Sequence, residues 1–227
     1  MFGPLARCSA AVLVLSACAT SEIRSNPVAR IAWPPEVGYQ DGEAECPRAL
    51  PADLLSIDGL RPGRGLDDDL ADGVRIFGPS PLLHAGDAGA SRSWRCWSAA
   101  NGDGTVVVES TGLGIWWELR VLGPEIAFEG RDQCPRSKKV GRWLATGNGI
   151  RLGLARARVE SLVGAATKAS RGWFERMCFS KQKMTPAESA SMKAPAGNDF
   201  WGIASWFRGV FAGGRLAGFS IGWSESW

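Results

Sequence analysis

Two glycine-containing turns between β-prone stretches constrain the fold of this 227-residue chain more than any other feature. Asn101-Gly102-Asp103-Gly104 separates two such stretches near residue 100, and Gly213-Gly214 separates residues 206–211 from residues 216–223. Asn-Gly, Asp-Gly and Gly-Gly pairs accept the positive φ angles of tight hairpin turns. The sequence therefore predicts an antiparallel hairpin in each half of the chain. In the second half a helix is the alternative, because Phe200, Ile203, Phe207 and Val210 also fit one side of a helix.

Further strands follow from alternation with a period of two residues, which is typical of a half-buried strand. We expect an antiparallel meander over residues 73–128, with short strands at 74–77 and 126–128 and an aspartate-rich solvated turn before it. Residues 172–180 predict another strand. The longest alternating stretch places Ile115, Trp117, Leu119 and Val121 on one side and Trp116, Glu118, Arg120 and Leu122 on the other.

The second half of the chain also predicts helices. Val159, Leu162 and Val163 form the apolar side of a short helix, and Gly164 stands where a helix stops. Thr185-Pro186-Ala187-Glu188 predicts the start of another helix. The threonine can cap the helix, proline favours the first helical position, and the glutamate completes a capping box. The fold class is therefore α+β, an antiparallel β meander followed by a small helix-on-sheet module.

The stretch Gly149-Ile150-x-Leu152-Gly153, with Val159 and Gly164 after it, is similar to a segment of known envelope proteins. It resembles small periplasmic lipoproteins of the SmpA/OmlA (BamE) kind and β-lactamase-inhibitor-protein-like modules. The resemblance implies a helix layer packed on an antiparallel sheet, and a role in binding proteins. Ala155 stands where those proteins usually have a helix-capping serine.

The N-terminus carries a second resemblance. An apolar run over residues 10–17 is too short to cross a membrane and ends at Leu15-Ser16-Ala17-Cys18. This tetrapeptide resembles the lipobox of bacterial lipoproteins, which implies cleavage before Cys18 and attachment of lipid, including palmitate, to its thiol. Ala19 favours retention in the outer membrane, facing the periplasm. An ordinary cleaved signal peptide is the alternative.

These features divide the chain into four parts. Residues 1–17 are expected to be a lipoprotein signal peptide, and residues 18–45 a tether rich in proline and glycine. Residues 46–142 are expected to form a β-rich subdomain. Residues 143–227 are then the α+β module that resembles the envelope proteins.

Four cysteines remain after the lipid-bearing one, and in an oxidising compartment they predict two disulfides. Three pairings are possible, and we favour Cys46–Cys96 with Cys134–Cys178 because each bridge then lies within one half. A zinc site is disfavoured because no two of these cysteines are two to four residues apart. We expect no metal and no cofactor.

Charge is unevenly distributed along the sequence. Residues 36–72 hold ten acidic and three basic residues, a net charge of −7, whereas residues 131–183 hold thirteen basic and three acidic residues, a net charge of +10. The two blocks can face each other or remain solvated, or the basic block can attract an anionic partner. Arg136, Lys138 and Lys139, beside Cys134, are the candidate contact residues.

Trp116 and Trp117 are adjacent on an expected strand, so they point to opposite faces and are candidates for an exposed aromatic contact. His84, the only histidine, lies near Asp87, but no nucleophile elbow supports a Ser-His-Asp site. We therefore expect a non-enzymatic lipoprotein that binds an envelope protein, in assembly, inhibition or immunity, and no nucleic acid. The alternatives are a module that binds peptidoglycan and a periplasmic hydrolase with an unrecognised site.

Overall fold

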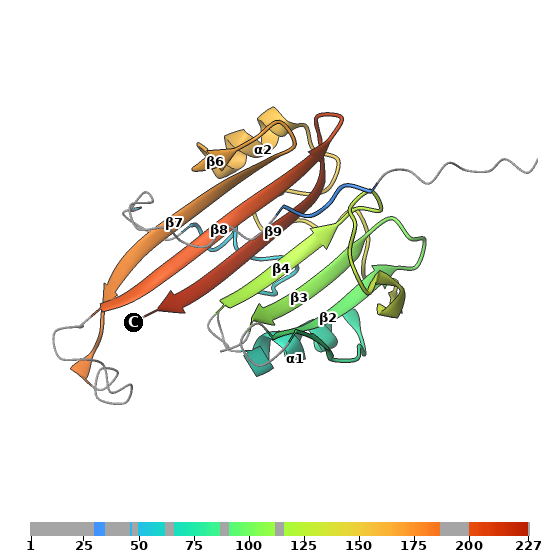
Figure 1. The fold of residues 1–227 in the computed structure, drawn as a ribbon, viewed down its shortest axis with the longest axis horizontal. Helices are drawn as coiled ribbons and strands as arrows, with labels where there is room; N and C mark the ends of the chain where they lie inside the picture. Colours follow the sequence, from blue (N-terminus) through green and yellow to red (C-terminus); the bar gives the residue numbers. More distant parts are fainter. Residues whose placement is uncertain are drawn as a thin grey trace, which may run out of the picture.

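A mostly antiparallel sheet forms the body of the protein (Figure 1). The computed structural model describes residues 30–34, 46, 50–61, 66–86, 91–111, 116–186 and 200–226. Eight strands run in the order β1-β2-β3-β4-β9-β8-β7-β6, and β5 pairs in parallel with β2. The strands are β1 (Leu83–Ala85), β2 (Arg92–Ala99), β3 (Thr105–Thr111), β4 (Trp116–Leu122), β5 (Arg136–Ser137), β6 (Lys168–Ala169), β7 (Trp173–Lys183), β8 (Phe200–Ala212) and β9 (Arg215–Ser226).

Both predicted hairpins are confirmed. Gly102 has a φ of 80° in the turn between β2 and β3, and Gly213 and Gly214 have φ values of 55° and 76° between β8 and β9. These angles belong to the left-handed region, which glycine enters at little cost. The predicted strand at 172–180 is also present, as β7.

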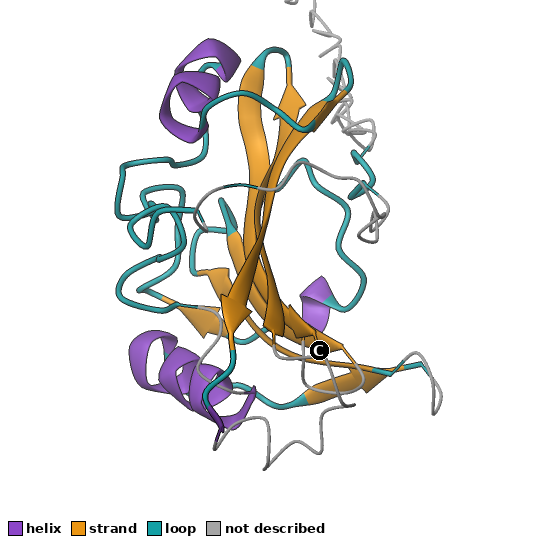
Figure 2. Ribbon diagram, turned by 90° about the vertical axis from the view of Figure 1, so that its left-hand side faces the viewer, coloured by secondary structure: helices purple, strands orange, loops and turns teal. Residues whose placement is uncertain are grey.

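The two described α-helices lie on the same face of the sheet (Figure 2). They are α1 (Leu66–Phe77) and α2 (Arg156–Val163). Beneath them, the odd-numbered residues of β4 and β9 and the even-numbered residues of β3 form the larger apolar core. Its fully buried members include Trp97, Val106, Leu119, Phe174, Phe207, Phe219 and Ile221.

Helix α1 corrects two predictions, since residues 74–77 are not a strand and the aspartate-rich stretch before them is not a turn. Leu70 and Phe77 are buried, and Val74 packs against the same core. Their spacing of four and three residues places them on one side of a helix. Packing of that side on the sheet outweighs the β preference of the short stretch at 74–77.

Helix α2 matches the predicted short helix. It buries Val159 and Val163 and ends at Gly164, whose φ is 92°. Ala155 occupies the N-cap position and makes no side-chain capping bond. The backbone NH of Gly153 donates to the Leu216 carbonyl, and that of Arg156 donates to the Gly214 carbonyl, so the β8–β9 turn holds the start of α2.

The opposite face of the sheet is covered by two stretches far apart in sequence. One is residues 30–34, and the other is residues 123–134, which include the short 3-10 helix η1 (Arg131–Gln133). Ile31 forms a parallel bridge with Ile126, and Trp33 packs against the smaller apolar cluster on this face. The strand predicted at 126–128 is therefore a single bridge, because the following turn carries the chain away from the sheet.

Two disulfides are present, but the favoured pairing is wrong. The bridges are Cys46–Cys178 and Cys96–Cys134. Cys178 belongs to the helix-covered face of the sheet, whereas Cys96 and Cys134 belong to the opposite face. Each bridge therefore stays on one face, and the sheet itself separates Cys96 from Cys46.

One sheet extends across the expected subdomain boundary at residues 142 and 143, because β4 pairs with β9 over seven residues. In the ranges described above, no helix is both long and apolar enough to span a membrane. The expected signal peptide, Cys18 and most of the helix expected from Thr185 lie outside the described residues.

Candidate functional site

The candidate contact residues from the sequence lie at one end of the β2–β3 hairpin. Arg136 is in β5 and lines a cavity of about 420 Å³, and its Nη1 donates to the Ala99 carbonyl at 2.8 Å. Lys138 and Lys139 are exposed in the turn that follows. The Cys96–Cys134 bridge ties the beginning of this segment to β2.

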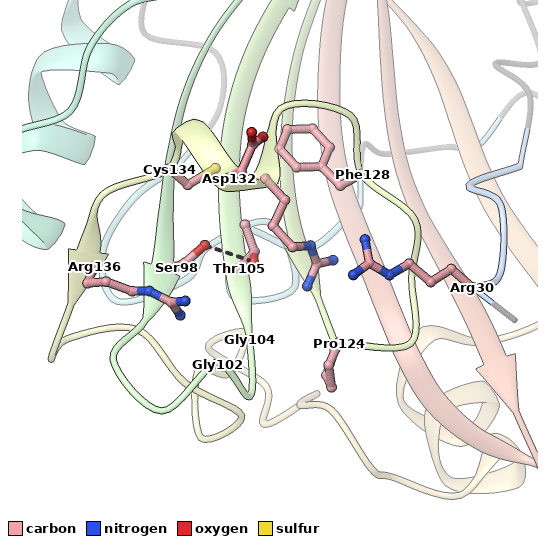
Figure 3. Close-up of a pocket in the computed structure, with 11 residues that line it drawn as sticks. Arg30, Ser98, Gly102, Gly104, Thr105, Pro124, Phe128, Asp132, Cys134 and Arg136 are labelled. Atoms are coloured by element: carbon pink, nitrogen blue, oxygen red, sulfur yellow. Dashed lines mark hydrogen bonds between the residues drawn. The ribbon is translucent and has the colours of Figure 1, made fainter. Parts of the chain in front are cut away.

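Three arginines line the cavity, together with a single carboxylate, Asp132, so its formal charge is +2, three minus one. Arg30 and Arg136 are directed into it from opposite sides (Figure 3). The hydroxyls of Ser98 and Thr105 lie 3.3 Å apart between them. The complete lining is Arg30, Ser98, Gly102, Gly104, Thr105, Pro124, Phe128, Arg131, Asp132, Cys134 and Arg136.

Arg131, the third arginine, is fixed by its own loop. Its Nη2 donates to the carbonyls of Gly123 at 3.1 Å and Ile126 at 2.7 Å. Its Nε is buried and has no hydrogen-bond partner among the described residues. Burial lowers the pKa of Arg131, the charge of Arg30 lowers it further, and Glu125 offsets part of the effect.

This arrangement is suited to an oxyanion. Guanidinium groups bind carboxylates and phosphates through paired, charge-assisted hydrogen bonds, which are stronger than those between neutral groups. The backbone anchors of Arg131 and Arg136 restrict their side chains before a ligand arrives, which reduces the entropy lost on binding. Sequence reasoning singled out Arg136 but missed Arg30 and Arg131. Arg131 begins the basic block, whereas Arg30 lies a hundred residues away in the expected tether.

An exposed tryptophan, Trp143, ends residues 136–143, the segment that begins with Arg136 of the cavity lining. Trp143 is 55% exposed, and its ring lies against Gly141, where any side chain would collide with it. Gly141 in turn packs against Gly104 of the cavity lining. Sequence reasoning missed Trp143, because it lies outside any alternating strand pattern.

Trp117 does not provide the exposed contact that was expected. It is buried, with 8% of its surface exposed, on the helix-covered face opposite Trp223. A second layer covers that face, which the alternation of β4 alone could not show. The side chain of Trp116 lies outside the described side chains.

Charged residues are buried in adjoining rows across the other face of the sheet, an arrangement we call the charged ladder. In one row, strand pairing places Arg120 beside Ser220, Ser220 beside Arg208, and Arg208 beside Glu175. The next row pairs Glu109 with Glu118. All are less than 6% exposed, although alternation along β4 suggested a solvated side.

The charges of the ladder are paired with one another. Arg120 lies 3.3 Å from Glu109 and donates from Nε to Glu118 at 2.7 Å. Arg208 donates from Nε to Glu175 at 2.8 Å. Burial would raise the pKa of Glu118, but the charges of Arg120 and Arg208, with the hydrogen bond from Arg120, outweigh burial and lower it. Glu118 is thus held as a carboxylate. The ion pairs of the charged ladder connect β3 with β4 and β7 with β8.

His84 lies on β1, outside the lining of the arginine cavity. Its Nδ1 is 2.9 Å from the Ser93 hydroxyl of β2, and the pair is exposed. Asp87, the expected third member of a Ser-His-Asp site, falls outside the described residues. A serine–histidine pair on an edge strand is a local cross-strand contact, so the arginine cavity remains the stronger candidate.

Comparison with known proteins does not assign this chain to a family. No family model and no curated protein matches the sequence. A solved structure, PhnF from Mycobacterium smegmatis, is similar to 66% of this chain with 14% identity and a TM-score of 0.21. The matched part spans 57% of that protein. A likeness at this TM-score carries no information about fold or function.

Proposed function

We propose that this chain is a lipid-anchored envelope protein that binds an acidic segment of a partner protein and performs no chemistry of its own. The observation that carries the proposal is the exposed Trp143 in the 136–143 segment, among Lys138, Lys139 and Arg142, beside a cavity lined by arginines. Tryptophan and arginine are enriched at the energetic centres of protein interfaces. The Cys96–Cys134 bridge holds the segment in place, which lowers the entropy lost on association.

The charge of this surface specifies the partner. The exposed cations and the +2 cavity attract an acidic segment and raise the rate of encounter. Lipidation of Cys18 would keep the body at the periplasmic side of the outer membrane, where that partner would be found. The resemblance of residues 149–164 to envelope protein-binding modules agrees with this role.

The anchor is tested by Cys18→Ala. We expect the variant to leave the membrane fraction or to accumulate unprocessed, because a lipoprotein is held by the acyl chains on this cysteine. Fractionation and the mass of the N-terminal peptide measure the result. Cys8→Ala, within the expected signal peptide, is the matched control and should fractionate normally. Unchanged fractionation of Cys18→Ala, without loss of lipid mass, would contradict the anchor.

The contact surface is tested by photocrosslinking in native membranes, with benzoylphenylalanine in place of Lys139. We expect a protein adduct of defined mass whose yield falls about tenfold or more in Trp143→Ala, because central interface aromatics contribute about 2 kcal/mol or more. Lys138→Glu should lower the yield in the same direction. Adduct yields are read by immunoblot and the crosslinked peptide by mass spectrometry.

Helix α2 offers the control, since Arg158 is also exposed. A crosslinker at position 158 should not capture the same protein, and Arg158→Glu should leave the yield at position 139 unchanged. Equal capture at both positions would contradict the proposed surface. Retention on purified sacculi that is lost in Trp143→Ala, without a protein adduct, would instead favour the cell-wall module.

A further inference from the structure

The arginine cavity is built partly by the segment that connects the N-terminus to the body. Arg30 lines the cavity, and Ile31 and Trp33 after it pack against the smaller apolar cluster. The Ile31 NH donates to the Glu125 carbonyl at 2.8 Å, and the Ala127 NH donates to the Ile31 carbonyl at 2.8 Å. The Trp33 ring lies 5.5 Å from the Arg120 guanidinium and packs against Gly218. Docking of residues 30–34 therefore places Arg30, one of the three arginines, in the lining of the cavity.

Docking of residues 30–34 brings the positive charge of Arg30 near that of Arg131. Arg131 cannot turn away, because two carbonyls hold its Nη2, and its Nε is buried without a partner among the described residues. Burial lowers the pKa of Arg131, and the charge of Arg30, which lines the same cavity, lowers it further. In the empty cavity this repulsion opposes docking of residues 30–34. An anion between the two guanidiniums replaces the repulsion with attraction.

We propose that the cavity is an oxyanion site shared by the tether and the body, so that binding of a carboxylate group and docking of residues 30–34 strengthen each other. The inference rests on the proposed function, because the carboxylates are those of the acidic partner segment. The anion binds the docked state more tightly, and linkage requires that it shift the segment toward that state by the same factor. Partner binding at the cavity is thereby communicated to the chain that leads to the membrane.

The two hydrogen bonds of Ile31 provide the measurement. Amide hydrogen exchange of Ile31 and Ala127 is followed by NMR on the full mature protein, with a blocked triglutamate peptide or inorganic phosphate as probe. A blocked triglutamine peptide in sodium chloride of equal ionic strength is the control. If the probe binds only the docked state, exchange slows about tenfold at a concentration ten times its Kd. The Ile126 NH, which donates to Gly123 in the same loop, should change little.

Two variants separate the site from general charge effects. Arg30→Gln should abolish the slowing by either probe, and without a probe its Ile31 amide should exchange no faster than in the parent protein, because the repulsion is gone. Arg158→Gln removes the same charge from α2 and should keep the full response. Slowing that is equal in Arg30→Gln and the parent, or equal in sodium chloride and triglutamate, overturns the inference.

The outcomes also distinguish this inference from the proposed function. If phosphate protects Ile31 and Ala127 but triglutamate does not, the oxyanion site stands as a phosphate site and the acidic protein partner fails. If the crosslinked partner depends on Trp143 but neither probe slows exchange, the partner stands and the coupled anion site fails.

Discussion

Arg208→Met is expected to lower the free energy of unfolding by about 3–5 kcal/mol, because it leaves Glu175 as a buried carboxylate without its cation. Both side chains are 1% exposed, and Arg208 meets Glu175 through two guanidinium nitrogens. Arg208 also contributes to the lowered pKa of Glu118. Loss of one arginine therefore affects two carboxylates, and urea unfolding followed by tryptophan fluorescence measures the cost.

The double variant Arg208→Met with Glu175→Leu provides the decisive comparison. Replacement of a whole buried pair by apolar residues is often nearly neutral, so the double variant should be more stable than either single variant. Glu160→Gln breaks the partly exposed pair with Arg156 and should cost less than about 1 kcal/mol. A cost below about 1 kcal/mol for Arg208→Met would mean that the ladder does not join the strands.

Removal of the Cys46–Cys178 bridge, by alanine at both positions, is the second large effect. The bridge closes a separation of 132 residues, which corresponds to a loop-closure contribution of about 5 kcal/mol in the chain-entropy account. The Cys96–Cys134 bridge closes 38 residues and corresponds to about 4 kcal/mol. Measured losses are often smaller, about 2–5 kcal/mol. We expect the first double variant to lose more stability than the second in urea unfolding.

Each double variant is the control for the other, because each replaces one disulfide with two alanines. Equal losses would point to lost packing rather than loop closure. Free-thiol titration of the denatured, unreduced protein provides a further check, because each variant should keep the other bridge. One reactive thiol pair among Cys46, Cys96, Cys134 and Cys178 in the parent protein would contradict the pairing.

The hairpins, β7 and α2 were predictable because their signals are local. Turns and a helix end are marked in the sequence by glycines that adopt positive φ angles, namely Gly102, Gly164, Gly213 and Gly214. Helix α1 was also encoded locally, by the spacing of Leu70, Val74 and Phe77. It was missed because the four residues 74–77, three of them apolar, are equally compatible with a strand.

The site was less predictable, because its parts lie far apart in the sequence and meet only in the folded protein. The run of basic residues identified Arg136, Lys138 and Lys139, but no sequence pattern connects Arg30 to Arg131. The buried charges of the ladder were hidden for the same reason. Alternation assigns Glu118 and Arg120 to one face of β4, and only residues 30–34 and 123–134, folding back from elsewhere, make that face an interior.

The Cys46–Cys178 bridge also determines how the protein carries a mechanical load. In the proposed lipoprotein, a pull on the lipid at Cys18 acts first on the docked residues 30–34 and then on Cys46, whose covalent bond passes it directly to strand β7. The residues between the two cysteines cannot be drawn out, which removes roughly 450 Å of extensible chain at about 3.3–3.6 Å per residue. Tension at the membrane can therefore peel residues 30–34 away from the sheet while the closed loop behind them stays short.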